Sequence, residues 1–148
     1  MAIKDLLNED MKTAMREKKQ DALAAIRMAK SAIKNAEIDA KHDFDDAEVI
    51  KIVMKEVKTL KESFEEFAKA GREEAAAKTK AQMDALVKYL PTQLSEEEIR
   101  NTVAELIGGL AEELRADKGQ IMKVVMPALS GKADGKLINK AVSEYLQK

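Results

Sequence analysis

The sequence predicts an all-α protein, with a long-helix hairpin in its N-terminal part and a small helical bundle in its C-terminal part. Charged residues make up 36% of the 148 residues, and aromatic residues only 3%. Alanine, glutamate, lysine, leucine and methionine dominate the composition, and these residue types favour helices. Runs of β-branched residues bounded by turn signals, which would indicate strands, are missing. The chain is long enough to bury a core without disulfides or a structural metal.

Two further absences limit the chemistry of the protein. There are no cysteines, which excludes disulfides, thiolate metal ligands and cysteine catalysis. No stretch approaches the roughly 18 apolar residues of a membrane span, and the N-terminus lacks the apolar core of a signal peptide. We therefore expect a soluble, cytoplasmic protein that does not contact membranes.

Apolar residues at three- and four-residue spacing predict a first helix over about residues 3–18. Asp21 is expected to cap the second helix. Along that helix Arg27, Lys30 and Lys34 repeat at the same spacing, so they form a row on one flank. Solvation alone would explain such a row, and a row that faces phosphates would have the same spacing.

A polar segment, residues 42–46, precedes the longest predicted helix. Asp45 or Asp46 suits its N-cap, where a carboxylate lies near the positive end of the helix dipole. His42 and the neighbouring aspartates could hold a metal, but the segment lacks the glycine and the distant glutamate of an EF-hand loop. We expect capping here and no metal site.

The third predicted helix, residues 47–70, carries apolar residues at alternating steps of four and three between Val53 and Phe67. Their mean spacing of about 3.5 residues suits long, nearly antiparallel packing against another helix. Gly71 is expected to end this helix in the left-handed conformation, and a fourth helix follows over about residues 72–88. The two helices would form an elongated hairpin and not a catalytic cleft.

A boundary at Pro91 divides the chain into predicted subdomains of residues 1–90 and 91–148. Proline lacks a backbone donor and biases the preceding residue away from the helical conformation. Ser95 and Glu98 have the spacing of a capping box, which predicts the start of the fifth helix.

Two short helices are expected to complete the second subdomain. The sixth begins near Gly119, and Pro127 should kink or end it. The seventh has Asp134 as its N-cap. Lys136 and Lys140 lie four residues apart on the face of this helix that is not apolar.

Residues 126–142, MPALSGKADGKLINKAV, lie in the most basic part of the chain. Residues 118–148 hold six lysines and two acidic residues, for a net charge of +4, whereas the whole chain carries −1. A phosphate-binding loop needs four residues between its glycines and a Ser or Thr after the lysine. Only three residues separate Gly131 from Gly135, and Leu137 follows the lysine, so this is no nucleotide loop. The glycines permit a tight turn that does not need the lysines. These lysines could form a solvated helix face, or their charge could attract a polyanion.

No catalytic constellation is visible. A nucleophile needs a base held by an orienting group, and the single histidine lies among acids in a hinge. Carboxylate pairs are plentiful, but nothing distinguishes one of them. An independent enzyme is the least favoured class, and no cofactor is expected.

Three segments resemble the YqeY family. They are Arg27-Met28 with the AIKN of residues 32–35, the YLPTQLSEEE of residues 89–98, and the GKADGKLINK of residues 131–140. YqeY proteins are small bacterial proteins that are similar to the C-terminal tail of GatB, the B subunit of the glutamine-dependent amidotransferase acting on misacylated tRNA. The similarity covers essentially the whole chain, with the segments in family order.

The resemblance implies two helical subdomains and a role in docking tRNA. The chain would then be a non-catalytic accessory to tRNA charging or transamidation, with an aminoacyl-tRNA synthetase or an amidotransferase as a partner. The family's carbon–nitrogen ligase label belongs, by this resemblance, to the catalytic domain of GatB, which is not recognisable here.

The predicted RNA contacts follow from the basic charge and the family segments together. They are Lys123, Lys132, Lys136 and Lys140 with the turn at Gly131 and Gly135, and the row of Arg27, Lys30 and Lys34. Because no aromatic residue nearby offers a stacking platform, we expect recognition by shape and charge. The alternative is a protein-interaction adaptor without RNA contact, in which the long third helix holds a partner or a second copy.

Overall fold

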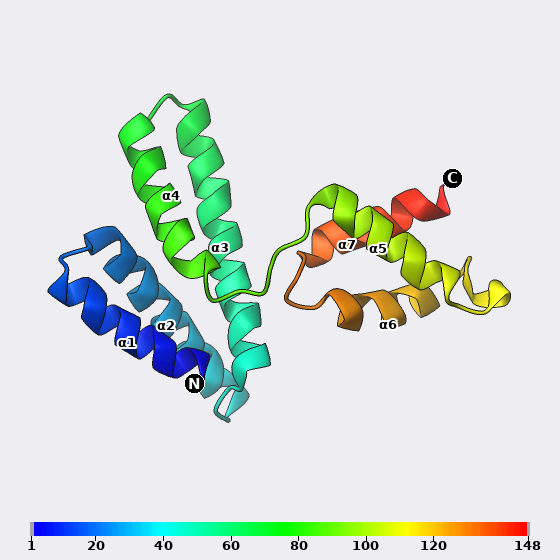
Figure 1. The fold of residues 1–148 in the computed structure, drawn as a ribbon, viewed down its shortest axis with the longest axis horizontal. Helices are drawn as coiled ribbons and strands as arrows, with labels where there is room; N and C mark the ends of the chain where they lie inside the picture. The colour runs from blue at the N-terminus through cyan, green and yellow to red at the C-terminus, as the bar shows by residue number, and fades with distance from the viewer. Residues whose placement is uncertain (1, 148) are drawn as a thin grey trace. The chain divides into compact units, whose positions relative to one another are not determined.

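The computed structural model describes residues 2–147, which fold into seven α-helices and one short 3₁₀ helix, with no strand in that range (Figure 1). The all-α prediction is confirmed. The helices are α1 (Ile3–Arg16), α2 (Gln20–Ala40), α3 (Asp46–Lys69), α4 (Glu73–Val87), α5 (Glu96–Gly108), the 3₁₀ helix η1 (Glu112–Leu114), α6 (Lys118–Leu129) and α7 (Gly135–Leu146).

The chain consists of two units, Met1–Leu90 and Pro91–Lys148, and each has its own apolar core. The N-terminal unit contains α1 to α4, and its core includes Leu7, Ile26, Ile33, Val53 and Leu86. The C-terminal unit contains α5 to α7, and its core includes Ile99, Val103, Ile121, Val125 and Ile138.

Local signals set the limits of the α3–α4 hairpin as predicted. Asp45 is the N-cap of α3: its side chain accepts a hydrogen bond from the Glu48 backbone N–H at 2.9 Å, and the Glu48 carboxylate accepts one from the Asp45 N–H. Gly71 lies in the tight connection to α4 with φ of +73°, a conformation that glycine adopts without a Cβ clash. In Figure 1 the two helices lie side by side, joined by this turn.

The apolar stripe of α3 packs inside its own unit. Val53 and Leu60 are buried in the core. Phe64 and Phe67 are half-buried, and the guanidinium carbon of Arg72 lies 5.3 Å from the centre of the Phe67 ring. The buried part of the stripe therefore packs within its own unit, and the adaptor alternative, in which α3 holds a partner, stays a prediction.

Two helix limits differ from those that single residues predict. Asp21 does not cap α2: the N-cap is Lys19, without a side-chain hydrogen bond, after a left-handed turn at Lys18 with φ of +58°. Pro127 does not end α6, which continues to Leu129, whereas a kink at Pro127 stays a prediction. A proline in the last turn costs only one backbone hydrogen bond, and the buried Val125 and Leu129 hold the helix on the core across it.

A partly buried side-chain contact joins the residues that follow α4 to α1. The Tyr89 hydroxyl donates a hydrogen bond to Asp10 Oδ2, and Lys88 Nζ lies 3.1 Å from the same oxygen. The Tyr89 hydrogen bond, aided by Lys88, lowers the pKa of the Asp10 carboxyl. Burial, with the neighbouring Asp10, raises the pKa of the Tyr89 hydroxyl. The Asp10 carboxyl is thus ionised at neutral pH in the folded chain.

Replacing Asp10 by asparagine should make the stability of the N-terminal unit less dependent on pH. A lowered folded-state pKa stabilises the fold above the unfolded-state pKa of about 4, and this contribution is lost as the pH falls. At neutral pH we expect Asp10→Asn to reduce the free energy of unfolding by about 1–2 kcal/mol, allowing for partial exposure of the carboxylate. Urea unfolding should show this difference shrinking toward about pH 3. A difference that stays constant with pH would contradict the assignment.

None of the helices within residues 2–147 is both long enough and apolar enough to cross a membrane.

Candidate functional site

The corner between α6 and α7 is held in place by the segment before α5. Gly131 is buried and has φ of +79°. Its carbonyl accepts a hydrogen bond from Gln93 Nε2 at 2.7 Å, and the Lys132 carbonyl accepts one from the Leu94 backbone N–H at 3.0 Å. The left-handed conformation at Gly131 favours glycine, since a side chain there would clash with the backbone.

Capping residues fix the first turns of α5 and α7. Ser95 Oγ accepts a hydrogen bond from the Glu98 N–H, and the Glu98 carboxylate accepts one from the Ser95 N–H, as the capping box predicts. The Ser95 N–H thereby lowers the pKa of Glu98. Asp134 caps α7 by accepting from the Lys136 N–H at 3.2 Å.

Gly135 has a different role from Gly131. It is the first residue of α7 and does not have a positive φ. A Cβ at this position would lie 3.7 Å from Met126 Cε, which is an ordinary contact. Together with Met122, Met126, Lys136, Asn139 and Lys140, it lines a shallow depression between α6 and α7. Only Gly131 is therefore required by the geometry of the turn.

The four predicted lysines of the C-terminal unit are all exposed. Lys123 lies on α6, Lys132 in the corner, and Lys136 and Lys140 on α7. Lys140 Nζ lies 3.6 Å from Glu96 Oε2, an exposed pair of little energetic weight. The ammonium groups of the other three make no hydrogen bond or ion pair with any residue that the structure describes.

Lys118, a fifth lysine of this unit, has a structural role. Lys118 Nζ donates to Asn139 Oδ1 at 2.9 Å and to Ser143 Oγ at 3.1 Å, which joins the start of α6 to α7. This lysine serves the packing of the unit. By contrast, Lys123, Lys132 and Lys136 are available to an external anion.

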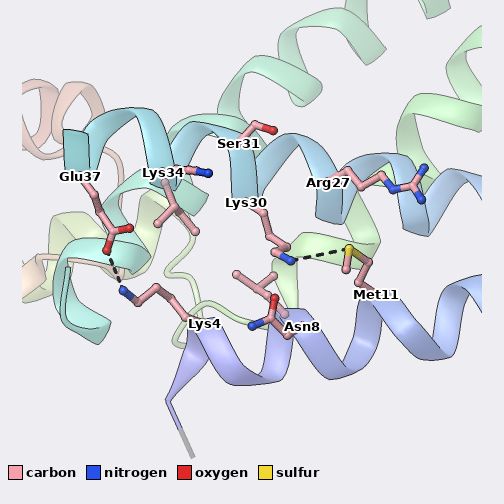
Figure 2. Close-up of a pocket in the computed structure, with 10 residues that line it drawn as sticks. Lys4, Asn8, Met11, Arg27, Lys30, Ser31, Lys34 and Glu37 are labelled. Carbon is pink, nitrogen blue, oxygen red and sulfur yellow. Dashed lines mark hydrogen bonds and ion pairs between the residues drawn. The ribbon is translucent and has the colours of Figure 1, made fainter. Parts of the chain in front are cut away.

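The row on α2 lies in the N-terminal unit and lines a groove against α1 (Figure 2). Arg27, Lys30 and Lys34 belong to this lining, so the predicted RNA contacts form two sets in two units. At one end of the groove Lys4 Nζ lies 2.6 Å from Glu37 Oε2. That ion pair lowers the pKa of Glu37 and raises the pKa of Lys4.

The sequence did not reveal the α1 side of this groove. Lys4, Asn8 and Met11 supply it, at the four- and three-residue steps of one helix flank. In the sequence, only the spacing of these three residues could have indicated that they share a flank of α1. The pairing of α1 with α2 was needed to show that the two flanks face each other.

The hinge histidine makes local contacts at the start of α3. His42 Nδ1 lies 2.9 Å from the Asp43 carbonyl oxygen, Nε2 lies 3.4 Å from Glu48 Oε2, and the ring contacts Phe44. Within residues 2–147, no three His, Cys, Asp or Glu side chains are grouped so that they could hold a metal ion. The hinge residues serve to cap and pack the start of α3.

The sequence matches one known family over nearly its whole length. The family is described as Yqey-like protein, and the match covers residues 4–146. The chain belongs to the YqeY family. The resemblance inferred from the three sequence segments is thereby confirmed, and the family includes both units of the structure.

Curated relatives of this YqeY protein come from several organisms. "Altered inheritance of mitochondria protein 41, mitochondrial" of Pyrenophora tritici-repentis is 36% identical over 144 residues, which is 95% of this chain and 78% of that protein. The Saccharomyces cerevisiae protein of the same name is 34% identical and covers 81% of this chain and 66% of its own length. A glutamyl-tRNA(Gln) amidotransferase subunit of Aeropyrum pernix is 38% identical over 68 residues, 43% of this chain but only 11% of that protein.

These relatives correct two expectations. The sequence analysis expected a bacterial protein in the cytoplasm, whereas the relatives that cover most of this YqeY chain are named as mitochondrial proteins. Both expectations are wrong on this finding. They depended on the apolar pattern of the N-terminal residues and on the family resemblance, and neither bears on mitochondrial import.

Proposed function

We propose that this YqeY protein binds tRNA through its C-terminal unit, as a non-catalytic accessory to tRNA charging or transamidation. The observation that carries the proposal is the exposure of Lys123, Lys132 and Lys136 around the α6–α7 corner, where they have no anionic partner among residues 2–147. The partial similarity to part of an amidotransferase named for tRNA supports the choice of RNA.

The rigidity of the corner supports binding by charge and shape. Gln93 and Leu94 hold its backbone, and Asp134 caps the helix that carries Lys136 and Lys140. The lysines therefore project from a fixed backbone, so little ordering of the chain is needed when phosphates bind. Long ammonium side chains contact phosphates without reading bases, which predicts weak sequence preference.

The direct test is a titration with tRNA at several salt concentrations. Replacing Lys132, Lys136 and Lys140 together by glutamate should weaken binding by at least about tenfold at low salt. It should also reduce the slope of log affinity against log salt by roughly two to three, because each lost phosphate contact removes slightly less than one unit.

A charge-matched control is available on α3. Lys51, Lys55 and Lys61 are exposed, and their side chains make no ion pair or hydrogen bond within the described part of the chain. Their triple change to glutamate alters the net charge equally but leaves the corner intact. Equal losses of binding in both triple variants, or no loss in either while circular dichroism shows them folded, would reject the proposed interface.

A further inference from the structure

The groove between α1 and α2 combines the features of a small-molecule site with strong positive charge. Its volume is about 570 Å³, within the range of about 300–1,000 Å³ that is usual for ligand pockets. Four cationic side chains and one carboxylate line it, for a net charge of +3. The single carboxylate, Glu37, already forms an ion pair with Lys4 and accepts a hydrogen bond from the Phe44 backbone N–H.

Lys30 lies at the middle of the groove without an anionic partner. It is half-buried, and Figure 2 shows its side chain reaching from α2 toward α1. Its only hydrogen-bond partner among the described residues is Met11 Sδ at 3.7 Å, and a thioether is a weak acceptor. A partly desolvated ammonium group is stabilised much better by an anion. Arg27 and Lys34, on the same row, make no side-chain hydrogen bond or ion pair to residues 2–147.

The rest of the lining suits an apolar body with polar edges. Met11 is half-buried and presents apolar surface to the groove, and the buried Leu7 and Ile33 lie beneath that surface. Asn8 and Ser31 are exposed, and neither side chain makes a hydrogen bond within the described chain. A ligand could therefore place a ring on the apolar residues and find hydrogen-bond partners at its edges.

We propose that this groove binds a nucleotide, with its phosphate at Lys30 and Lys34 and its base on Met11. Two or three unpaired cations match a dianionic phosphate better than a single carboxylate. The groove spans about ten residues of α2, from Arg27 to Glu37, or roughly 15 Å. That length suits one nucleotide. The Lys4–Glu37 ion pair lies at one end of the groove. The proposal does not depend on tRNA binding by the C-terminal unit.

Calorimetric titration of the full chain with AMP, GMP, CMP and UMP tests the proposal. At least one monophosphate should bind saturably, and the matching nucleoside and inorganic phosphate should each bind more weakly. Lys30→Met keeps the hydrocarbon stem and removes the charge, and it should weaken binding by about tenfold or more. Amide resonances of α1 and α2 should shift on titration.

Lys61→Met, an exposed lysine on α3 without side-chain partners in the described chain, is the matched control and should bind as the unaltered chain does. Thermal unfolding checks that both variants are folded. No saturable binding of any monophosphate up to about 1 mM, or equal binding by Lys30→Met, overturns the proposal. So does loss of tRNA binding in Lys30→Met without nucleotide binding, which would make this row an RNA contact only.

Discussion

Replacing Leu86 by alanine is expected to reduce the free energy of unfolding of the N-terminal unit by about 2–5 kcal/mol. Leu86 lies on α4 with its side chain fully buried among the core residues of α2 and α3. Removing it loses the free energy of apolar burial and leaves a cavity that the surrounding helices fill only in part. Hydrogen exchange of amides in residues 3–87 would report the loss.

Its neighbour provides the matched control. Val87 is 39% exposed on the same helix, so Val87→Ala should change the free energy of unfolding by no more than about 0.5 kcal/mol. Comparable losses in the two variants would mean that α4 does not pack on the core through the face that includes Leu86.

Replacing Val125 by alanine is expected to destabilise the C-terminal unit by about 2 kcal/mol. Val125 is fully buried on α6. Two buried carbon groups account for roughly 1.6 kcal/mol, and the cavity adds to this. A unit of about 60 residues has a total stability of only roughly 3–9 kcal/mol. The variant should therefore unfold at clearly lower denaturant concentration, as measured by hydrogen exchange of amides in α5, α6 and α7.

Val124, the adjacent residue, is the matched control because it is also a valine. Val124 is 38% exposed, and Val124→Ala should stay within about 0.5 kcal/mol of the unaltered chain. Alanine favours the helix more than valine does, so helix propensity cannot cause a loss of stability in either variant. If both valine variants lost equal stability, burial would not distinguish the two positions, and the assigned core of this unit would be wrong.

Sequence patterns predicted the fold best where one residue acts on its own backbone. Asp45, Ser95 and Asp134 cap helices because their side chains reach N–H groups two or three residues on, and spacing alone reveals this. Gly71 likewise ends α3 for a local reason. By contrast, tertiary packing decides the structure at Pro127. The buried Val125 and Leu129 keep α6 helical beyond a proline that, by its local effect alone, would end the helix.

In the candidate sites, too, the sequence predicted local features and missed those that depend on tertiary packing. The spacing of Arg27, Lys30 and Lys34 placed them on one flank of α2, but the groove requires α1, whose register against α2 depends on packing. Around the α6–α7 corner the sequence could not separate Lys118, which joins two helices, from lysines that have no partner in the described chain. Nor could it show that Gly131 alone of the two glycines has a positive φ.

The hydrogen bonds from Gln93 and Leu94 to the corner determine where the C-terminal unit can be cut from the chain. A fragment that begins at Pro91 retains both donors, whereas one that begins at Ser95, the cap of α5, removes them. The Gly131 and Lys132 carbonyls would then exchange these donors for water, at a net cost of about 0.5–1.5 kcal/mol for each hydrogen bond. The shortest excisable fragment therefore extends upstream of its first helix, because this extended peptide completes the bundle.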